Sequence, residues 1–479
     1  MDYPFARTDV ARYNELTAVP AIDAHSWKDL LLDAYLARLS EGTSIFGQQM
    51  LYHRLRSATA DSREQVQACV ADAPLRTRLE TACRGMREAD AEVSETLFGA
   101  ALPAAPWWAR WLALLPVALL ACMAAAMLWG GLWLPALGLC GLMLALQAVW
   151  HDRVREWERE LRSLQLMLAA CSTVWPDESA AVRRLGRQLS QSVLARMPLL
   201  REYSEWLLLR NISHYFASRA LVAQHLALLR SCYERVAALE ADLALARHLS
   251  GLEQFCWSGR SQRGELELQG VLHPLLPAPL ALDLSLRGTG AFISGQNGAG
   301  KSTLLRAVGL NTVTARAFGF CYARSARLPD LPVYTSMQTE DALESGESLY
   351  IAELRRAREL LAIAGEGPAL FIVDEIFRGT NHLESVSAAA AVMEELAQRG
   401  TVLVSSHNLV LATLLKDHLA PLCVRRNGQG MRLEHGILGE TNGLALLGEQ
   451  GFSLQIQEKA VQVHGELLAQ IRERAAISG

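Results

Sequence analysis

The segment Gly295–Ser302, with the sequence G-Q-N-G-A-G-K-S, has the residue types and spacing of a loop that holds phosphate groups. Its glycines allow backbone N–H groups to close around phosphate oxygens, and the amino end of a following helix adds a positive dipole. Lys301 can reach the terminal phosphates of a nucleotide, and the Ser302 hydroxyl can bind Mg²⁺. We therefore expect a nucleotide site whose binding residues are Gly295, Gln296, Asn297, Gly298, Ala299, Gly300, Lys301, Ser302 and Thr303.

A pair of carboxylates follows the apolar run 370–373. Transfer of a phosphoryl group to water needs one carboxylate to hold Mg²⁺, directly or through water, and another to orient the attacking water. Asp374 suits the first role and Glu375 the second. A third apolar run, 401–404, leads to His407, a polar side chain that can sense the terminal phosphate. These patterns predict Lys301, Glu375 and His407 as catalytic residues, and Ser302 and Asp374 as metal ligands.

The elements around these residues alternate between strand and helix patterns, which is typical of an α/β domain. We expect this P-loop domain over 258–452 and a separate C-terminal helix over 453–479. Apolar stripes at helical spacing predict a helical core-like region over 1–105 and a helical core and lever over 153–257.

Between the two helical regions lies an uncharged stretch, residues 111–150. The ranges 111–129 and 132–150 are each long enough to cross a hydrocarbon core of about 30 Å. Tryptophans stand at their ends and arginines flank them, as at a membrane interface. We expect a transmembrane helical hairpin within 106–152, with both termini and the P-loop domain on the cytoplasmic side of an inner or cytoplasmic membrane. A buried hairpin in a large soluble core is the alternative, and the uncharged length disfavours it.

Composition narrows the possible partners. The net charge of −4 gives no global basic field for nucleic acid, although a local basic face is compatible with it. The nine cysteines are scattered and none forms C-x-x-C, which argues against a zinc site or a disulfide framework. Residues 1–7 do not have the layout of a signal peptide.

The motifs of the α/β region resemble those of the ATPase domain of the MutS family of DNA mismatch-repair proteins, a branch of the ABC-type ATPases. The loop with Asn297 is similar to the family's G-P-N-x-x-G-K-S, with Gln296 in place of the proline. The sequence D-E-I-F-R-G-T at 374–380 resembles D-E-I-G-R-G-T, with Phe377 in place of a glycine. His273-Pro274 and Ser406-His407 match further family elements. The likeness covers 260–460 and, more loosely, 20–100.

The resemblance implies an ATPase that uses ATP and Mg²⁺ and acts as a homodimer. Segment 341–353 resembles the family's D-D-L-x-x-G-x-S-x-F-x-x-E, which contacts the nucleotide of the other subunit. Ser348, Tyr350 and Glu353 are thereby implied as nucleotide contacts across the dimer. DNA is implied as a partner by analogy alone. No Phe-x-Glu triplet, the family's mismatch-reading wedge, occurs in the sequence, so mismatch specificity is not expected.

The predicted fold is multidomain: a helical core and lever bundle, interrupted by a transmembrane hairpin, precedes an ABC-type P-loop domain. The favoured function is a membrane-anchored, MutS-like ATPase coupled to DNA or to another partner. An ABC-type transporter-associated ATPase is one alternative, although two spans are few for a transport pathway and no L-S-G-G-Q occurs. A membrane scaffold that uses nucleotide as a switch is the other, which the full set of catalytic residue types disfavours.

Overall fold

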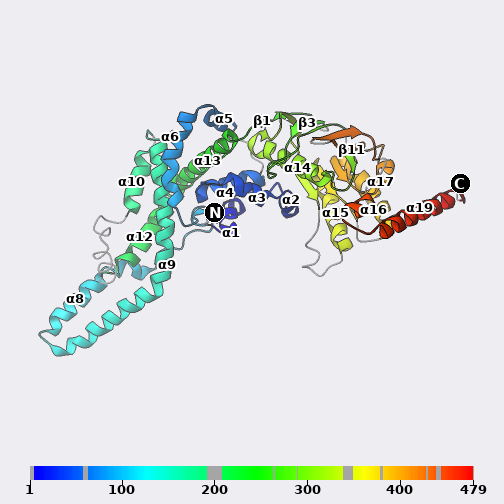
Figure 1. Cartoon of the computed structure of the whole chain (residues 1–479). Helices are drawn as coiled ribbons and strands as arrows, with labels where there is room; N and C mark the ends of the chain where they lie inside the picture. Colours follow the sequence, from blue (N-terminus) through cyan, green and yellow to red (C-terminus); the bar gives the residue numbers. More distant parts are fainter. Residues whose placement is uncertain are drawn as a thin grey trace. The chain divides into compact units, whose positions relative to one another are not determined.

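The chain divides into two compact units in the computed structural model, which describes residues 5–57, 63–177, 179–190, 208–262, 265–288, 290–337, 349–377, 381–427, 430–438 and 444–477. A helical unit comprises Met1–Pro20, Leu36–Ser57 and Asp61–Leu252. An α/β unit comprises mainly Ala21–Tyr35 and Glu253–Gly479. The prediction of a helical N-terminal region followed by an α/β domain is confirmed at this level (Figure 1).

The helical unit is organised around helix α13, Leu226–Ser250, which packs against α4 (Ile45–Ser57), α5 (Arg63–Ala71) and α9 (Trp133–Val174). Most of the middle of α13, from Val236 to Ala246, is buried. Its run of Ala and Leu without Gly or Pro favours a long helix, and burial on several sides supplies its stability. The other described helices of this unit are α1 (Arg7–Thr17), the second half of α3 (Leu32–Leu39), α6 (Ala73–Cys83), α7 (Ser94–Phe98), α8 (Leu114–Ala126), α10 (Ala180–Leu189) and α12 (Arg210–Gln224).

The uncharged stretch folds as two helices, α8 and α9, that lie side by side (Figure 1). Helix α8 is shorter than the expected 111–129, because 3₁₀ turns at Trp107–Trp111 and Gly130–Leu132 lie on either side of it. Helix α9 continues past the expected end at 150 to Val174, because residues 151–175 contain no Gly or Pro that would end it before Pro176. Among the described residues, one helical stretch, Gly130–Val174, is long and apolar enough to cross a membrane.

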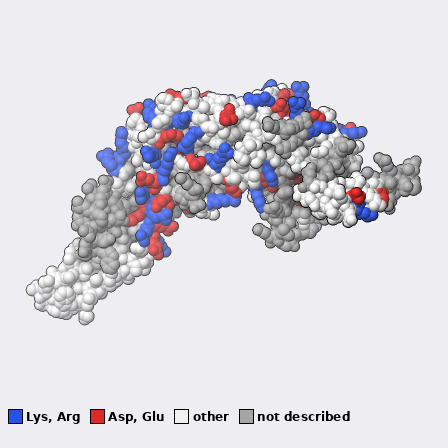
Figure 2. Space-filling view, viewed as in Figure 1, with Lys and Arg blue, Asp and Glu red and all other residues white. Residues whose placement is uncertain are grey.

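The surface of this hairpin is apolar. Figure 2 shows no Lys, Arg, Asp or Glu over the tip of α8 and α9 on the face in view, whereas both signs are mixed over the rest. Large side chains on both helices are exposed, including Leu120 (55%), Leu134 (77%) and Leu137 (66%). Among the described residues of the helical unit, these large side chains of the hairpin are therefore not buried as those of a core hairpin would be.

Helix α12 packs at the foot of the hairpin. The ring of Trp150 lies 5.9 Å from that of Trp108 and 5.0 Å from that of Phe216 on α12. The amides of Gln147 and Asn211 exchange two hydrogen bonds, of 3.1 and 2.9 Å. The side-chain amide of Gln147, inside the uncharged stretch, therefore has its hydrogen-bond partner on α12, a helix that follows about sixty residues later in the chain.

The α/β unit contains a six-stranded sheet in the order β12-β11-β5-β10-β9-β8. All neighbours in it are parallel except β11 and β12. A four-stranded sheet, β2-β7-β3-β4, and a two-stranded sheet, β1-β6, complete the unit. The strands are β1 (Cys256–Trp257), β2 (Gly259–Arg260), β3 (Glu265–Val271), β4 (Leu282–Arg287), β5 (Gly290–Gly295), β6 (Phe320–Cys321), β7 (Ser325–Leu328), β8 (Val333–Ser336), β9 (Leu370–Asp374), β10 (Thr401–Ser405), β11 (Ala420–Asn427) and β12 (Gly430–His435).

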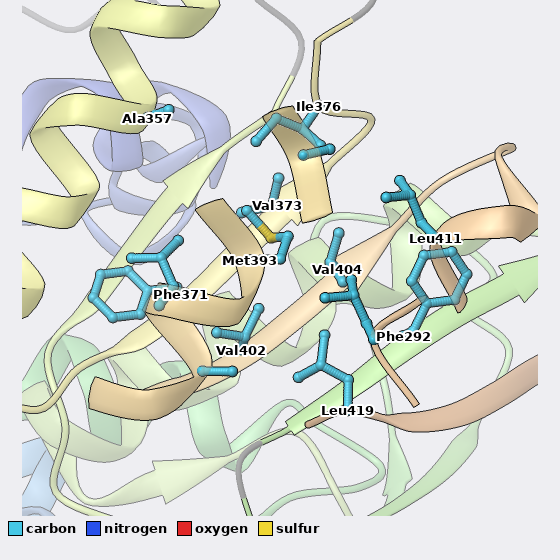
Figure 3. Packing of buried hydrophobic residues seen from close by; sticks show 14 of the residues in the cluster. Phe292, Ala357, Phe371, Val373, Ile376, Met393, Val402, Val404, Leu411 and Leu419 are labelled. Carbon is cyan, nitrogen blue, oxygen red and sulfur yellow. The ribbon is translucent and has the colours of Figure 1, made fainter. Parts of the chain in front are cut away.

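A buried apolar cluster joins this sheet to its covering helices (Figure 3). Phe371 and Val404 of the strands meet Ala357 of α15 (Leu349–Glu366) and Met393 of α16 (His382–Arg399). Strands β5, β9 and β10 are buried along their whole length, which agrees with their nearly continuous apolar sequences. Helix α14 (Lys301–Phe318) follows β5, α17 (Leu409–Leu414) follows β10, and α18 (Ala445–Glu449) and α19 (Leu454–Ile477) end the chain.

A short N-terminal helix, α2 (Ala24–Asp29), covers the edge strand β8. The Ser26 hydroxyl accepts a hydrogen bond from the Thr335 N–H at 2.9 Å, and Asp29 accepts one from the Thr335 hydroxyl at 2.6 Å. Arg356 of α15 reaches Asp23 at 2.7 Å. Residues 21–35, which lie within the expected N-terminal region 1–105, thus pack in the α/β unit, where they protect an exposed sheet edge.

Candidate nucleotide-binding site

Three neighbouring parallel strands, β5, β10 and β9, end at the same edge of the six-stranded sheet. The first leads into loop 296–300, and the others end at Ser405 and Asp374. Ligands of open α/β sheets bind beyond such carboxyl ends. A cavity of about 450 Å³ lies there, and the described residues that line it are Gly298, Gly300, Lys301, Ser302, Thr303, Asp374, Glu375 and His407. The structure therefore brings together both proposed metal ligands and all three proposed catalytic residues.

The loop before α14 depends on glycine. Gly300 has a φ of 93°, a left-handed backbone that other residues adopt at a cost. A Cβ at this position would also come within 3.0 Å of the Met431 side chain. Helix α14 begins directly after it, at Lys301, so the unpaired N–H groups and the positive dipole end of the helix lie at the loop.

Lys301 lies across the loop that precedes it. Its Nζ donates hydrogen bonds to the carbonyls of Gly295, at 3.1 Å, and Gln296, at 3.4 Å. The residue is only 7% exposed. Burial lowers the pKa of Lys301, and the nearby carboxylates of Glu375 and Asp374 oppose that shift. The ammonium group is thus held at the cavity wall with two carboxylates near it.

The two carboxylates differ in their surroundings. Asp374 is buried, and its Oδ1 accepts a hydrogen bond from the Ser405 hydroxyl. The Glu375 N–H donates to the Ser405 carbonyl at 2.9 Å, and its Oε1 lies 3.3 Å from His407 Nε2. Ser405 is not among the residues predicted from the sequence. Its role follows from the register of β9 and β10, which places it directly opposite Asp374.

A second, smaller cavity of about 200 Å³ adjoins the first, since Gly298, Gly300 and Thr303 line both. Its other described walls are mostly apolar: Val271, Leu276, Ala278, Pro279, Leu280, Leu282, Ala299, Leu304, Ala307 and Met431, with His273. Burial lowers the pKa of His273, so its ring is neutral at neutral pH. Most of these residues could not be predicted from the sequence as walls of one cavity, because Met431 comes from β12 and the others from two separate segments, 271–282 and 298–307.

The remaining predicted residues fall into three groups. Gln296 and Asn297 are exposed in the loop, while Gly295 ends β5. Tyr350 and Glu353 lie on α15 and are not among the described residues that line either cavity. Ser348 and the sequence R-G-T at 378–380 lie outside the described residues.

With this geometry established, comparison with known proteins identifies the region. Residues 291–434 match MutS domain V. The matched segment includes nearly all of β5, the phosphate loop, β9 and β10, and every described residue that lines the larger cavity falls within it. The resemblance inferred from the motifs is confirmed for this part of the chain.

Similar curated proteins share this region. "DNA mismatch repair protein MutS" of Brevibacillus brevis is 29% identical over 278 residues, which cover 54% of this chain and 32% of that protein. The protein of the same name from Thermotoga petrophila is 27% identical over 216 residues, covering 42% and 27%. "Endonuclease MutS2" of Thermus thermophilus is 32% identical over 188 residues, covering 38% and 23%. The chain spans less than a third of the length of each of these relatives.

Proposed function

We propose that this protein is a membrane-anchored, MutS-like ATPase that hydrolyses ATP as a homodimer and couples hydrolysis to binding of DNA or another partner. The observation that carries the proposal is the meeting of Lys301, Ser302, Asp374, Glu375 and His407 around one cavity of about 450 Å³. This volume lies within the usual range for small-ligand sites. The match to MutS domain V over the same strands supports it.

The residues suit hydrolysis of a nucleoside triphosphate. Backbone N–H groups of the loop and Lys301 bind the phosphates. Ser302 and Asp374 line the same cavity and offer two oxygen ligands, the kind Mg²⁺ prefers, and the bound ion would neutralise phosphate charge. Glu375 orients a water whose oxygen attacks the terminal phosphorus, so that the bond to the bridging oxygen breaks and ADP leaves. His407, beside Glu375, holds that carboxylate and senses the terminal phosphate.

The smaller cavity suits the base of the nucleotide. It adjoins the phosphate loop, and its aliphatic walls can cover both faces of a flat ring. His273 is the titratable side chain among its described walls and can give or accept one hydrogen bond there. We place the adenine in this cavity, with the triphosphate running from Thr303 towards Asp374.

The exposed apolar surface of α8 and the first part of α9 supports a membrane anchor. Leu134, Leu137 and Leu120 would face lipid, and the aromatic rings of Trp108 and Trp150 would lie at its boundary. The anchored protein would then lie at an inner or cytoplasmic membrane, with both termini and the α/β unit in the cytoplasm. A transporter-associated ATPase or a nucleotide-switched scaffold remains the alternative reading of the same anchor.

ATP turnover of the full chain in detergent, with and without duplex DNA, tests the proposal. We expect slow, Mg²⁺-dependent phosphate release that DNA changes. DNA affinity should fall steeply between two salt concentrations, because phosphate contacts dominate it, and should be equal for matched and mismatched duplexes. A rate of ATP turnover that DNA does not change would favour a transporter-associated ATPase. Nucleotide binding without turnover would favour a membrane scaffold.

A further inference from the structure

The loop that follows the two carboxylates has an unusual backbone. Glu375 has a φ of 58° and Phe377 a φ of 57°, in the left-handed region that side chains with a Cβ disfavour. Two such residues within three positions mark a strained segment, and strain of this kind persists only where the surroundings impose it. Position 377 is also where the sequence departs from the D-E-I-G-R-G-T pattern, by placing a phenylalanine where that pattern has glycine.

The contacts of Phe377 show what imposes this backbone. Its side chain is fully buried in the apolar cluster that also contains Val373 and Ile376. Its carbonyl accepts a hydrogen bond from the Ser385 hydroxyl at the start of α16. The ring of Tyr350, in the first turn of α15, lies 6.0 Å away at an angle of 71°, which is an edge-to-face contact. Phe377 is therefore anchored to two helices.

The other end of the same short segment is anchored to the sheet. The Glu375 N–H donates to the Ser405 carbonyl at 2.9 Å, and Asp374 is bonded to the Ser405 hydroxyl. Only Ile376 separates Glu375 from Phe377. A glycine at 377 would adopt the same φ without strain and would have no side chain to bind α15. The phenylalanine instead links the backbone that carries the Glu375 carboxylate to the first turn of α15.

We infer that Phe377 is a positioning residue that fixes the direction of the Glu375 carboxylate through its contact with Tyr350. The inference rests on the proposed ATPase function and deepens it. Movement of the start of α15 is transmitted through the two rings and two peptide units to the carboxylate that orients water. Hydrolysis therefore depends on the position of α15, whereas binding of the nucleotide within the same subunit depends on the loop 296–300 and Lys301.

A double-mutant cycle tests this coupling. Phe377→Leu and Tyr350→Leu keep apolar bulk but remove the ring pair. We expect each to lower kcat for ATP by roughly tenfold and to change KM by less than about twofold, because a small misplacement of a catalytic group slows the chemical step. The double variant should be no slower than the slower single variant, because the contact is already lost. Leu354→Ala, a truncation at an exposed position of α15 outside 341–353, is the matched control and should keep the wild-type kcat.

Melting temperatures accompany the kinetics, so that a loss of folded protein is not read as a loss of positioning. Tyr350 is only half-buried, so Tyr350→Leu should fold even if Phe377→Leu does not. Losses that multiply to roughly a hundredfold in the double variant, or a wild-type kcat in Tyr350→Leu, would overturn the inference. A wild-type protein without Mg²⁺-dependent turnover would reject the proposed function itself, whereas wild-type turnover with independent losses rejects only the role of Phe377.

Discussion

At the scale of single residues, the larger cavity combines one lysine with two carboxylates, Asp374 and Glu375. Lys301 does not neutralise both of them, so the wall near Asp374 favours a divalent cation. The opposite wall, formed by the loop and the start of α14, favours anions. A triphosphate together with Mg²⁺ places negative charge at the loop and positive charge at the carboxylates. These residues can therefore bind such a ligand only when the fold brings them to one cavity.

Substitutions at Lys301 and Glu375 should separate binding from chemistry. Lys301→Ala removes a charge-assisted contact to phosphate and should weaken ATP binding by roughly 10- to 100-fold. Glu375→Gln keeps a similar shape but cannot activate water, so it should keep binding and lose roughly 100-fold or more in turnover. Nucleotide binding and phosphate release measured on each variant check this. Wild-type turnover in Glu375→Gln would remove this residue from the mechanism.

The helical unit should lose stability in mild acid because of His248. Burial, with Arg38 nearby, lowers the pKa of His248 from 6.5 to about 4. Below pH 6.5 the unfolded chain therefore binds a proton at His248 that the folded chain does not bind. The contribution of neutral His248 to the free energy of unfolding is fully present above about pH 6.5 and is lost as the pH falls towards 4. Between pH 7 and pH 5 the loss that comes from His248 should be roughly 2 kcal/mol.

Thermal unfolding at pH 7 and pH 5, followed by tryptophan fluorescence, measures this loss. His248→Gln has no titrating ring, so its melting temperature should fall less over the same interval than that of the wild-type protein. Equal falls in the two proteins would show that other groups control the acid response.

At the scale of elements, α13 and α4 are joined by buried polar contacts. The Ser44 hydroxyl and N–H donate to the buried carboxylate of Glu240. Arg54 Nη1 lies 2.6 Å from Asp242 Oδ1, and both side chains are almost completely buried. A buried ion pair contributes little beyond an apolar pair, but it makes the loss of one partner costly. These contacts therefore fix the register of α4 on α13 more than they add stability.

Removal of one partner tests that statement. Arg54→Met leaves the Asp242 carboxylate buried and should destabilise the helical unit by about 3–5 kcal/mol. Adding Asp242→Leu should recover much of this loss, since neither charge of the pair is then left buried without its partner. Chemical denaturation of the two variants and the wild-type protein measures the difference. A double variant that is no more stable than Arg54→Met would contradict this account of the pair.

The hairpin of α8 and α9 gives a second prediction at this scale. Arginines in place of Leu120 and Ala121 should cost roughly 5–7 kcal/mol of membrane insertion and abolish retention in the membrane fraction. The apolar exchange Leu120→Ala with Ala121→Leu is the control and should stay in that fraction. A wild-type protein that is soluble without detergent would contradict the anchor.

At the scale of the whole molecule, the resemblance of 341–353 implies that Ser348 acts on the nucleotide of a second subunit. A two-fold symmetric dimer would then contain two composite sites. Ser348→Arg and Lys301→Ala should each be inactive alone. A mixed dimer pairs the intact loop of the first variant with the intact Ser348 of the second, so mixing should restore part of the activity. No recovery, with subunit exchange demonstrated separately, would contradict the assignment of Ser348 across the dimer.

The sequence alone predicted the order of the helical and α/β regions, and it grouped the candidate site residues that stand next to one another in the chain. The loop 295–302 and the Asp374-Glu375 pair are local patterns, because the backbone geometry they need is set by neighbouring residues. The uncharged sequence predicted a transmembrane hairpin of two spans, whereas one described helical stretch, Gly130–Val174, is long and apolar enough to cross a membrane. The helix ends also differ from the expected ones, because a change from apolar to charged residues does not end a helix.

Contacts between distant segments were decided only by the tertiary structure. Ser405 meets Asp374 because β9 and β10 pair in one register, and Met431 reaches the phosphate loop from a strand that lies after it in the chain. Residues 21–35 join the α/β unit because the hydrogen-bonding groups of Asp23, Ser26 and Asp29 fit the edge strand β8 and Arg356. In the sequence, Phe377 is only a departure from the family motif. Its left-handed backbone and its contact with Tyr350, which the structure shows, are what indicate a positioning role. In each case the deciding interaction joins residues far apart in the chain, and such pairings depend on strand order and packing that local sequence does not encode.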